Sequence, residues 1–197
     1  MSKPFSQACE NNRGPILDIL MPLLAKKTKV LEIGSGTGQH AVWFAQHMPH
    51  LIWQTSDLLD KHSAIKQWIA DYPADNLLPP IVLDMLTDKW PSQRYDAIFT
   101  ANTAHIMPWQ GVVNMLTKGG SQLQSNGLFC LYGPMGYGGV IAPHSNIQFD
   151  HYLRQQLPHQ GIRQFEDIDR LATAAGLKFL HKDALPANNH LLVWQKL

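Results

Sequence analysis

Residues Val30–His40 read VLEIGSGTGQH and are more informative than any other segment of the chain. An apolar run carries one acid, Glu32, and leads into three glycines spaced G-x-G-x-G, at Gly34, Gly36 and Gly38, before a helix-like segment. Because glycine has no Cβ, a ligand can approach the backbone of such a turn closely. Dinucleotide-binding turns usually read G-x-G-x-x-G, with a later third glycine. The stretch therefore predicts a strand–turn–helix unit that cradles a nucleotide-like ligand; glycines kept only for packing are the alternative.

The composition indicates a single-domain globular protein and argues against nucleic acid or a membrane as partner. Of the 197 residues, 45% are hydrophobic and 16% are charged, which suits a globular chain, and we expect one domain over residues 1–197. The formal net charge is +1 and no basic run is longer than Lys26-Lys27, so neither nucleic acid nor an anionic membrane is expected as partner. No segment has the length or apolar character of a signal peptide or a membrane span.

Cysteine and histidine usage indicates neither disulfides nor a metal site. Cys9 and Cys130 are far apart in the sequence, which favours a reducing, cytoplasmic setting. The histidines are numerous but scattered, and Pro49 separates His47 from His50, so the two cannot share one regular helical face. We therefore expect no bound metal.

Strand-like and helix-like patterns alternate along the chain. Pro22 is expected to kink or split the first helix, Gly119-Gly120 to interrupt the fourth, and residues 133–161 to be glycine-rich and then irregular. The alternation favours a mostly parallel sheet with helices on both faces. The last two strands have no helix between them and should pair antiparallel. The predicted strands cover 29–33, 51–55, 81–83, 95–100, 128–132, 177–181 and 191–195, and the predicted helices cover 13–26, 38–48, 61–72, 110–123 and 167–175.

Polar residues follow the second and third predicted strands. In open parallel sheets the ligand lies at the carboxyl ends of the strands, where the strand order reverses. Asp57 can there accept hydrogen bonds from both hydroxyls of a ribose. Asp84 can accept from the amine of adenine while the Met85 N–H donates to the ring. A helix N-cap at Asp57 and a turn-capping role for Asp84 are the alternatives.

Together, Glu32–Gly38, Asp57, Asp84 and the terminal hairpin resemble class I S-adenosylmethionine (SAM) methyltransferases. The resemblance implies a Rossmann-like α/β fold with a seven-stranded, mostly parallel sheet and a C-terminal antiparallel hairpin. It also implies SAM as cofactor and S-adenosylhomocysteine (SAH) as product. Within that superfamily, five segments resemble a small, poorly characterised group of methyltransferase-like proteins of unknown substrate; they are residues 9–16, 36–40, 102–109, 145–149 and 186–189.

The cofactor site follows from these positions. Burying the carboxylate of Glu32 in a strand without a partner would cost free energy of desolvation. The α-ammonium of the methionine moiety, or a structural lysine or arginine, would offset that cost. Arg13, in an expected N-terminal helical lid of about residues 1–27, is predicted to pair with the methionine carboxylate, whereas Asn12 could simply cap the helix near Pro15. The predicted cofactor-binding residues are Arg13, Glu32, Gly34, Ser35, Gly36, Gly38, His40, Asp57, Leu58, Asp84, Met85 and Asn102.

The loop after the fourth strand, residues 100–109, is where many amino-methyltransferases carry (D/N)-P-P-(Y/F). In this chain Asn102 is followed by Thr103-Ala104, which argues against methylation of a nucleobase or a protein amide. His105 is the candidate catalytic base because imidazole titrates near neutrality; a histidine bonded within a turn is the alternative. Asn102 is the second candidate catalytic residue and is expected to seat the methionine end of the cofactor.

Residues 133–139 are expected to form a lid or a wall of the acceptor site. His144, Asn146 and the pair Asn188-Asn189 are expected to line it, although the asparagine pair could equally serve the hairpin turn.

The leading functional hypothesis is a SAM-dependent methyltransferase, monomeric or homodimeric, with a small-molecule acceptor, because the core fold uses all 197 residues and leaves no domain to grip a macromolecule. A non-catalytic SAM- or SAH-binding sensor or partner subunit is the runner-up. A nicotinamide-dependent dehydrogenase is the third, and it predicts six parallel strands.

Overall fold

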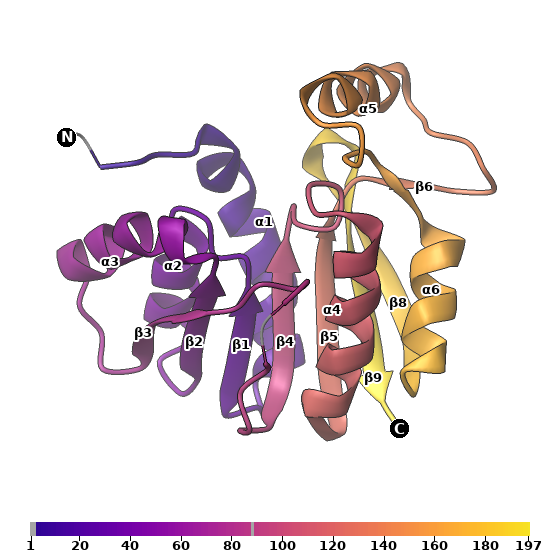
Figure 1. Cartoon of the computed structure of the whole chain (residues 1–197). Helices are drawn as coiled ribbons and strands as arrows, with labels where there is room; N and C mark the ends of the chain where they lie inside the picture. The colour runs from indigo at the N-terminus through magenta and orange to yellow at the C-terminus, as the bar shows by residue number, and fades with distance from the viewer. Residues whose placement is uncertain (1–2, 88) are drawn as a thin grey trace.

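A computed structural model describes residues 3–87 and 89–197 of the chain (Figure 1). Up to β5 a helix separates each strand from the next, except that no helix of the described residues lies between β3 and β4, and a hairpin of two long strands ends the chain. The strands are β1 Lys29–Ile33, β2 Ile52–Asp57, β3 Leu77–Val82, β4 Tyr95–Ala101, β5 Leu123–Gly133, β6 Met135–Gly136, β7 Arg163–Gln164, β8 Leu177–Leu185 and β9 Asn189–Lys196. The helices are α1 Gln7–Leu24, α2 Gln39–His47, α3 His62–Asp71, α4 Trp109–Gln122, α5 His144–Gln156 and α6 Phe165–Ala174, with short 3₁₀ turns η1 Leu59–Lys61 and η2 Pro186–Asn188.

The main sheet of the described chain has seven strands in the order β3-β2-β1-β4-β5-β9-β8. β3, β2, β1, β4 and β5 are parallel neighbours, whereas β9 runs antiparallel to both β5 and β8. The strand order therefore reverses between β1 and β4, and the sheet ends in the expected antiparallel hairpin. This arrangement confirms the class I methyltransferase fold and contradicts the six parallel strands of the dehydrogenase alternative.

Helices cover both faces of this sheet (Figure 1). Alternate residues of the central strands point to opposite sides, so that Val30 packs under α1 and α2 while Leu31 packs under α4. On the first face Ile16, Leu20 and Leu24 of α1 join the core, and on the second face α4 and α6 do so. Each face is thus sealed by apolar contacts, and only the strand ends remain for a ligand.

The helices are not split at either of the positions where the sequence predicted an interruption. α1 begins at Gln7, with Ser6 as N-cap, and continues through Pro15 and Pro22 without splitting. α4 runs unbroken through Gly119 and Gly120. A Cβ at Gly119 would lie 2.8 Å from Cε2 of Phe129, and one at Gly120 would lie 2.8 Å from the carbonyl oxygen of Ala175. These glycines therefore permit close packing and do not end the helix.

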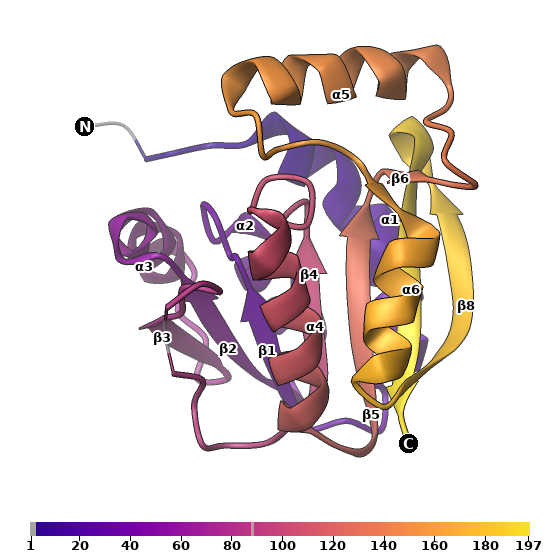
Figure 2. The same ribbon diagram turned by 45° about the vertical axis from the view of Figure 1, so that its right-hand side comes forward.

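The prediction that the segment up to residue 161 is irregular is also wrong, because it contains α5. Figure 2 shows α5 lying across the top of the molecule, beyond the carboxyl ends of the central strands. Its sequence is mostly polar, so it carries no helical apolar period that the sequence pattern could reveal. The third strand is longer than predicted because β3 is an edge strand, where Pro79 and Pro80 are tolerated.

Candidate functional site

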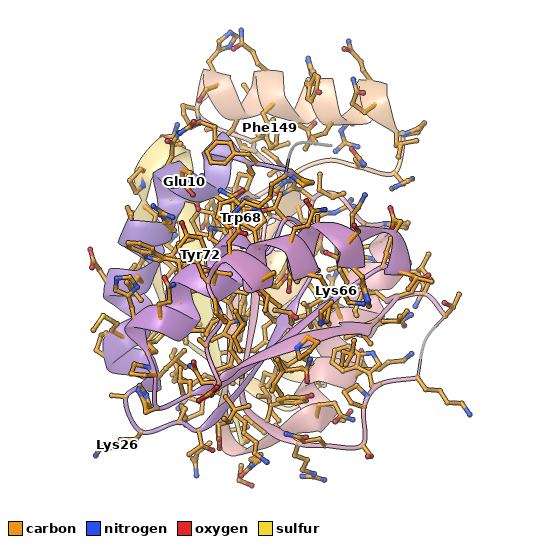
Figure 3. All side chains as sticks on the ribbon, turned by 90° about the vertical axis from the view of Figure 1, so that its left-hand side faces the viewer. Glu10, Lys26, Lys66, Trp68, Tyr72 and Phe149 are labelled. Carbon is orange, nitrogen blue, oxygen red and sulfur yellow. The ribbon has the colours of Figure 1, made fainter. Side chains whose placement is uncertain are left out.

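A cavity of about 800 Å³ opens where the strand order reverses, at the carboxyl ends of β1, β4 and β5. Its volume falls within the roughly 300–1,000 Å³ that is typical of small-molecule sites. The glycine turn and the start of α1 form one side, the loop after β4 forms the floor, and α5 with η2 closes the other side. Figure 3 shows Phe149 projecting from α5 toward the first turns of α1, where Glu10 lies. Segments from both ends of the chain thus meet over the switch point.

The glycine turn is held open by bonds to the end of β2. The backbone N–H groups of Gly34 and Ser35 both donate to the carbonyl oxygen of Ser56. Gly36 has a φ of 58° and would find no heavy atom within 4 Å of an added Cβ. Gly38 precedes α2, and an added Cβ would lie 3.1 Å from Cα of Ile65, so this glycine packs against α3 and not against the sheet. Open space over Gly36 is what a ligand against the backbone requires.

Asp57 stands at the end of β2 beside this turn. Its Oδ2 accepts the N–H of Gly36 at 2.7 Å, and its Oδ1 accepts the N–H of Leu58 at 2.7 Å. Burial raises the pKa of the Asp57 carboxyl, and these two bonds oppose that effect. Each carboxylate oxygen offers about two acceptor positions, so each has the capacity for one further hydrogen bond. The N-cap of the following 3₁₀ turn is Leu58, so the helix-capping alternative for Asp57 is wrong.

Glu32 is fully buried beside the glycine turn, and no lysine or arginine of the described chain pairs with it. Instead its Oε2 accepts hydrogen bonds from Oγ of Ser35 at 2.8 Å and from Nε1 of Trp53 at 3.2 Å. Burial raises the pKa of Glu32 to about 7, and the negative charge of Asp57 adds to this rise. The structural cation that one hypothesis expected is therefore not among the described residues, and the carboxyl group is held by neutral donors.

The loop after β4 brings the two candidate catalytic residues together. Asn102 has a φ of 59°, and an added Cβ on Gly133 would lie 3.8 Å from its Oδ1 and 3.6 Å from Nδ1 of His105. The ring of His105 packs edge-on against Phe149, with centroids 5.4 Å apart. Burial, with a smaller contribution from the positive charge of Arg163, lowers the pKa of His105 to about 4. His105 is therefore a neutral imidazole at the cavity wall at pH 7.

His40 lies opposite, in the first turn of α2. Its Nε2 is 2.6 Å from Oδ1 of Asn12, and because that oxygen only accepts, Nε2 donates. Burial lowers the pKa of His40 to about 4, so this imidazole is also neutral at pH 7. Asn12 lies inside α1, so it does not cap a helix near Pro15. Asn12 also bonds the hydroxyl of Tyr132, which joins α1, α2 and β5 in one polar wall.

The structure does not bring Arg13 to this cavity. Its guanidinium pairs with Glu10 at 2.8 Å and lies 4.0 Å from the ring centroid of Trp43. It lines a separate cavity of about 120 Å³ against α2 and α3. The geometry thus contradicts a contact between Arg13 and a ligand in the larger cavity, because the guanidinium is already paired and stacked elsewhere.

The predicted adenine contacts lie outside the cavity, past the ends of β2 and β3. Oδ1 of Asp84 accepts the N–H of Leu86 at 2.8 Å and its Oδ2 accepts the hydroxyl of Thr87 at 3.1 Å, which is the turn-capping alternative. Met85 is buried in the core, and its carbonyl accepts from Asn114 at 2.7 Å. Leu58 is 44% exposed beside Asp57 and leaves an apolar surface on which a base can lie.

Several cavity residues come from segments that sequence reasoning treated as irregular. Ser145 and Phe149 of α5 lie in the wall, together with Asn146, Asn188 and Asn189. His144, which was expected beside them, is not among the lining residues. Ala187 and Asn188 both have a φ of 59°, and this left-handed turn between β8 and β9 is what presents the asparagine pair. An asparagine-rich hairpin loop was the one available signal.

The described residues contain neither a cluster of metal-ligating side chains nor a helix that could span a membrane. In residues 3–87 and 89–197 no three side chains of His, Cys, Asp or Glu come together in a way that could hold a metal ion. Within those ranges, too, no helix has the length and apolar character needed to cross a membrane.

The fold and the cavity at its switch point place this chain among proteins with the class I methyltransferase fold. The chain belongs to the family described as "Protein of unknown function (DUF938)", whose sequence model matches residues 3–196.

Three solved structures illustrate the likeness. An O-methyltransferase family protein from Burkholderia thailandensis has a TM-score of 0.85 at 14% identity, covering 96% of this chain and 57% of its own. An O-methyltransferase family 2 protein from Planctomyces limnophilus, in complex with apigenin, has a TM-score of 0.81 at 18% identity, covering 94% and 56%. Human N-acetylserotonin methyltransferase, in complex with SAM, has a TM-score of 0.79 at 15% identity, covering 96% and 53%. The chain spans little more than half the length of these proteins, and at such identities the likeness concerns the fold.

Proposed function

We propose that this protein is a SAM-dependent methyltransferase with a small-molecule acceptor. The observation that carries the proposal is the cavity that joins the glycine turn to Asn102 and His105. One end of this cavity offers bare backbone at Gly36, whose N–H bonds to the carboxylate of Asp57 just outside the lining, and the other end holds a neutral imidazole. Transfer of a methyl group between two bound molecules needs a continuous space that holds both of them side by side. This cavity would provide a cofactor half and an acceptor half.

The residues fit an adenosyl ligand on three counts. Gly36 leaves the space above the turn free, Asp57 keeps acceptor positions for a ribose, and Leu58 exposes an apolar surface beside it. Bound SAM supplies a methyl group on a sulfonium, which is already a good electrophile. The protein therefore contributes mainly position and exclusion of water.

The neutral His105 is the group that would manage the proton. If the acceptor is a hydroxyl or an N–H group, a ring nitrogen of His105 would take the proton that the group loses and pass it to solvent, while SAM would supply the methyl group and leave as SAH. Asn102, within the same loop, would orient the acceptor or the methionine end of the cofactor through its amide. The buried setting of His105 keeps the ring unprotonated at pH 7, and the same burial makes it a weaker base than a histidine with a pKa near 7.

Two measurements test the proposal. Calorimetry measures the binding of SAM, SAH and NAD, and an activity assay then follows transfer of a labelled methyl group from SAM to a pool of metabolites. We expect SAM and SAH to bind, NAD not to bind, and label to appear in a small-molecule fraction. Binding of SAM without transfer would favour the sensor or partner-subunit hypothesis. A protein indifferent to SAM and SAH would refute the proposal altogether.

A further inference from the structure

We propose that the acceptor half of the cavity takes an uncharged polar molecule that bears hydroxyl or N–H groups, and that it discriminates against carboxylates, phosphates and amines. This inference rests on the proposed function for the reaction. The chemistry of the cavity wall can nevertheless be tested by binding alone.

The wall carries no formal charge. Among the described residues that line the cavity there is no lysine, arginine, aspartate or glutamate. Its histidines, His40 and His105, are neutral at pH 7 because burial lowers the pKa of each to about 4. Asparagine is the commonest residue type in the wall; the asparagines are Asn11, Asn12, Asn102, Asn146, Asn188 and Asn189.

The charged groups behind this wall already have partners. Arg163 donates to the carbonyl oxygens of Ala104 at 2.9 Å and Met107 at 2.7 Å, so its guanidinium is engaged behind His105. Asp150 of α5 accepts from Arg154 at 2.7 Å and from the N–H of Ile162 at 2.8 Å. A charged ligand would therefore find no free counter-charge from these elements.

An ion that entered the acceptor half, away from the glycine turn and Asp57, would exchange its hydration shell for amide dipoles. Amides satisfy hydrogen bonds but do not replace an opposite charge, so the desolvation of an ammonium or carboxylate would go largely uncompensated. A neutral ligand of the same shape avoids that cost, and the wall can satisfy its hydrogen bonds.

The amide groups next to α5 favour ligands that donate hydrogen bonds. Nδ2 of Asn146 donates to the carbonyl of Ala142 at 3.1 Å and to that of Asn188 at 3.5 Å, and Nδ2 of Asn188 donates to Oγ of Ser145 at 3.3 Å. Their N–H groups are thus used inside the wall. Asn146 lines the cavity, and its Oδ1 is not among the buried side-chain atoms of the described residues that lack a partner. An amide oxygen accepts, so Oδ1 of Asn146 can take a hydrogen bond from a hydroxyl or N–H of a ligand in the cavity.

Matched phenols test this inference. Ligand-observed NMR with SAH present measures the dissociation constants of 4-hydroxybenzamide, 4-hydroxybenzoate and tyramine, which share one ring and differ in charge. We expect 4-hydroxybenzamide to bind at least tenfold more tightly than either charged compound. Equal or tighter binding of the anion or the cation would overturn the inference, as would a failure of 4-hydroxybenzamide to bind.

A substitution that adds a negative charge to the cavity wall tests whether the selectivity against charged ligands arises there. Asn146→Asp should reduce the preference for 4-hydroxybenzamide over tyramine at least tenfold, because it supplies the counter-charge that the wall lacks. Asn126→Asp makes the same chemical change at an exposed position in β5, far from the cavity, and should leave the preference unchanged. Equal effects of the two substitutions would overturn the inference. If SAM binds but no acceptor is methylated, the proposed function fails while the measured charge selectivity still decides this inference.

Discussion

Replacing Glu32 by glutamine should make the protein more stable above pH 7 than the natural sequence. The carboxyl group of Glu32 is fully buried between the glycine turn and Trp53, and only neutral donors reach it. Burial raises its pKa from 4.5 to about 7, so the ionised form is disfavoured in the folded protein. Glutamine fills nearly the same volume, and its oxygen can accept the hydrogen bonds of Ser35 and Trp53 without any charge.

The size of the effect follows from linkage. Below pH 4.5 the group is protonated in both the folded and the unfolded chain, and stability does not depend on it. Between pH 4.5 and about 7 only the unfolded chain releases the proton, so the free energy of unfolding falls by about 1.4 kcal/mol per pH unit. Above about pH 7 the loss is complete and amounts to about 3 kcal/mol. Glu32→Gln removes this dependence.

Urea unfolding followed by tryptophan fluorescence, at about pH 4.5 and about pH 8, measures the difference in unfolding free energy between Glu32→Gln and the natural protein. We expect this difference to grow by about 3 kcal/mol in favour of the variant between the two pH values. Glu166→Gln is the matched control, since Glu166 is exposed, and its difference should be the same at both pH values. A pH-independent difference for Glu32→Gln would refute the reasoning.

Three further outcomes concern the ligand site. Asp57→Asn should weaken SAH binding at least tenfold by calorimetry while the midpoint of thermal unfolding changes little, and an unchanged affinity would rule out the ribose contact. His105→Ala should lower turnover about a hundredfold with SAM affinity unchanged, as expected for loss of a general base; natural rates would make it a structural residue. Gly36→Ala should lose SAH affinity because its methyl group enters the open space above the turn, and its φ of 58° adds a loss of stability. Gly119→Ala should lose stability and keep affinity, because its Cβ meets Phe129.

The sequence predicted the fold well because the fold depends on patterns that a sequence displays openly. β1 and β4 are buried on both faces and therefore read as apolar runs, and the hairpin is visible as two strands without a helix between them. The same reasoning failed at Gly119-Gly120, where helix-breaking residues serve close contact with Phe129 and Ala175. Local propensity gave way to tertiary packing at that point.

The site was less predictable because its two halves are built differently. The carboxyl ends of β1 and β2 bring Gly36 and Asp57 together, and their place in the sequence indicates their place in space. Arg13 was misjudged because a nearer partner, Glu10, lies one helical turn away on the same helix. The sequence shows Glu10, but Glu10 can pair with Arg13 in this way only if both residues lie in one helix. The predicted helix began at residue 13, six residues after the observed start of α1 at Gln7.

The two sides of the cavity are held in place by different parts of the fold. The glycine turn and Asp57 are fixed by the sheet, so a change there alters the cofactor half and also the bonds that hold the turn to β2. The other side of the cavity is formed by α5 and η2, which contribute no residue to the two apolar cores. On the proposed function, substitutions in α5 and η2 should therefore change which molecule is accepted while the fold and the glycine turn stay intact.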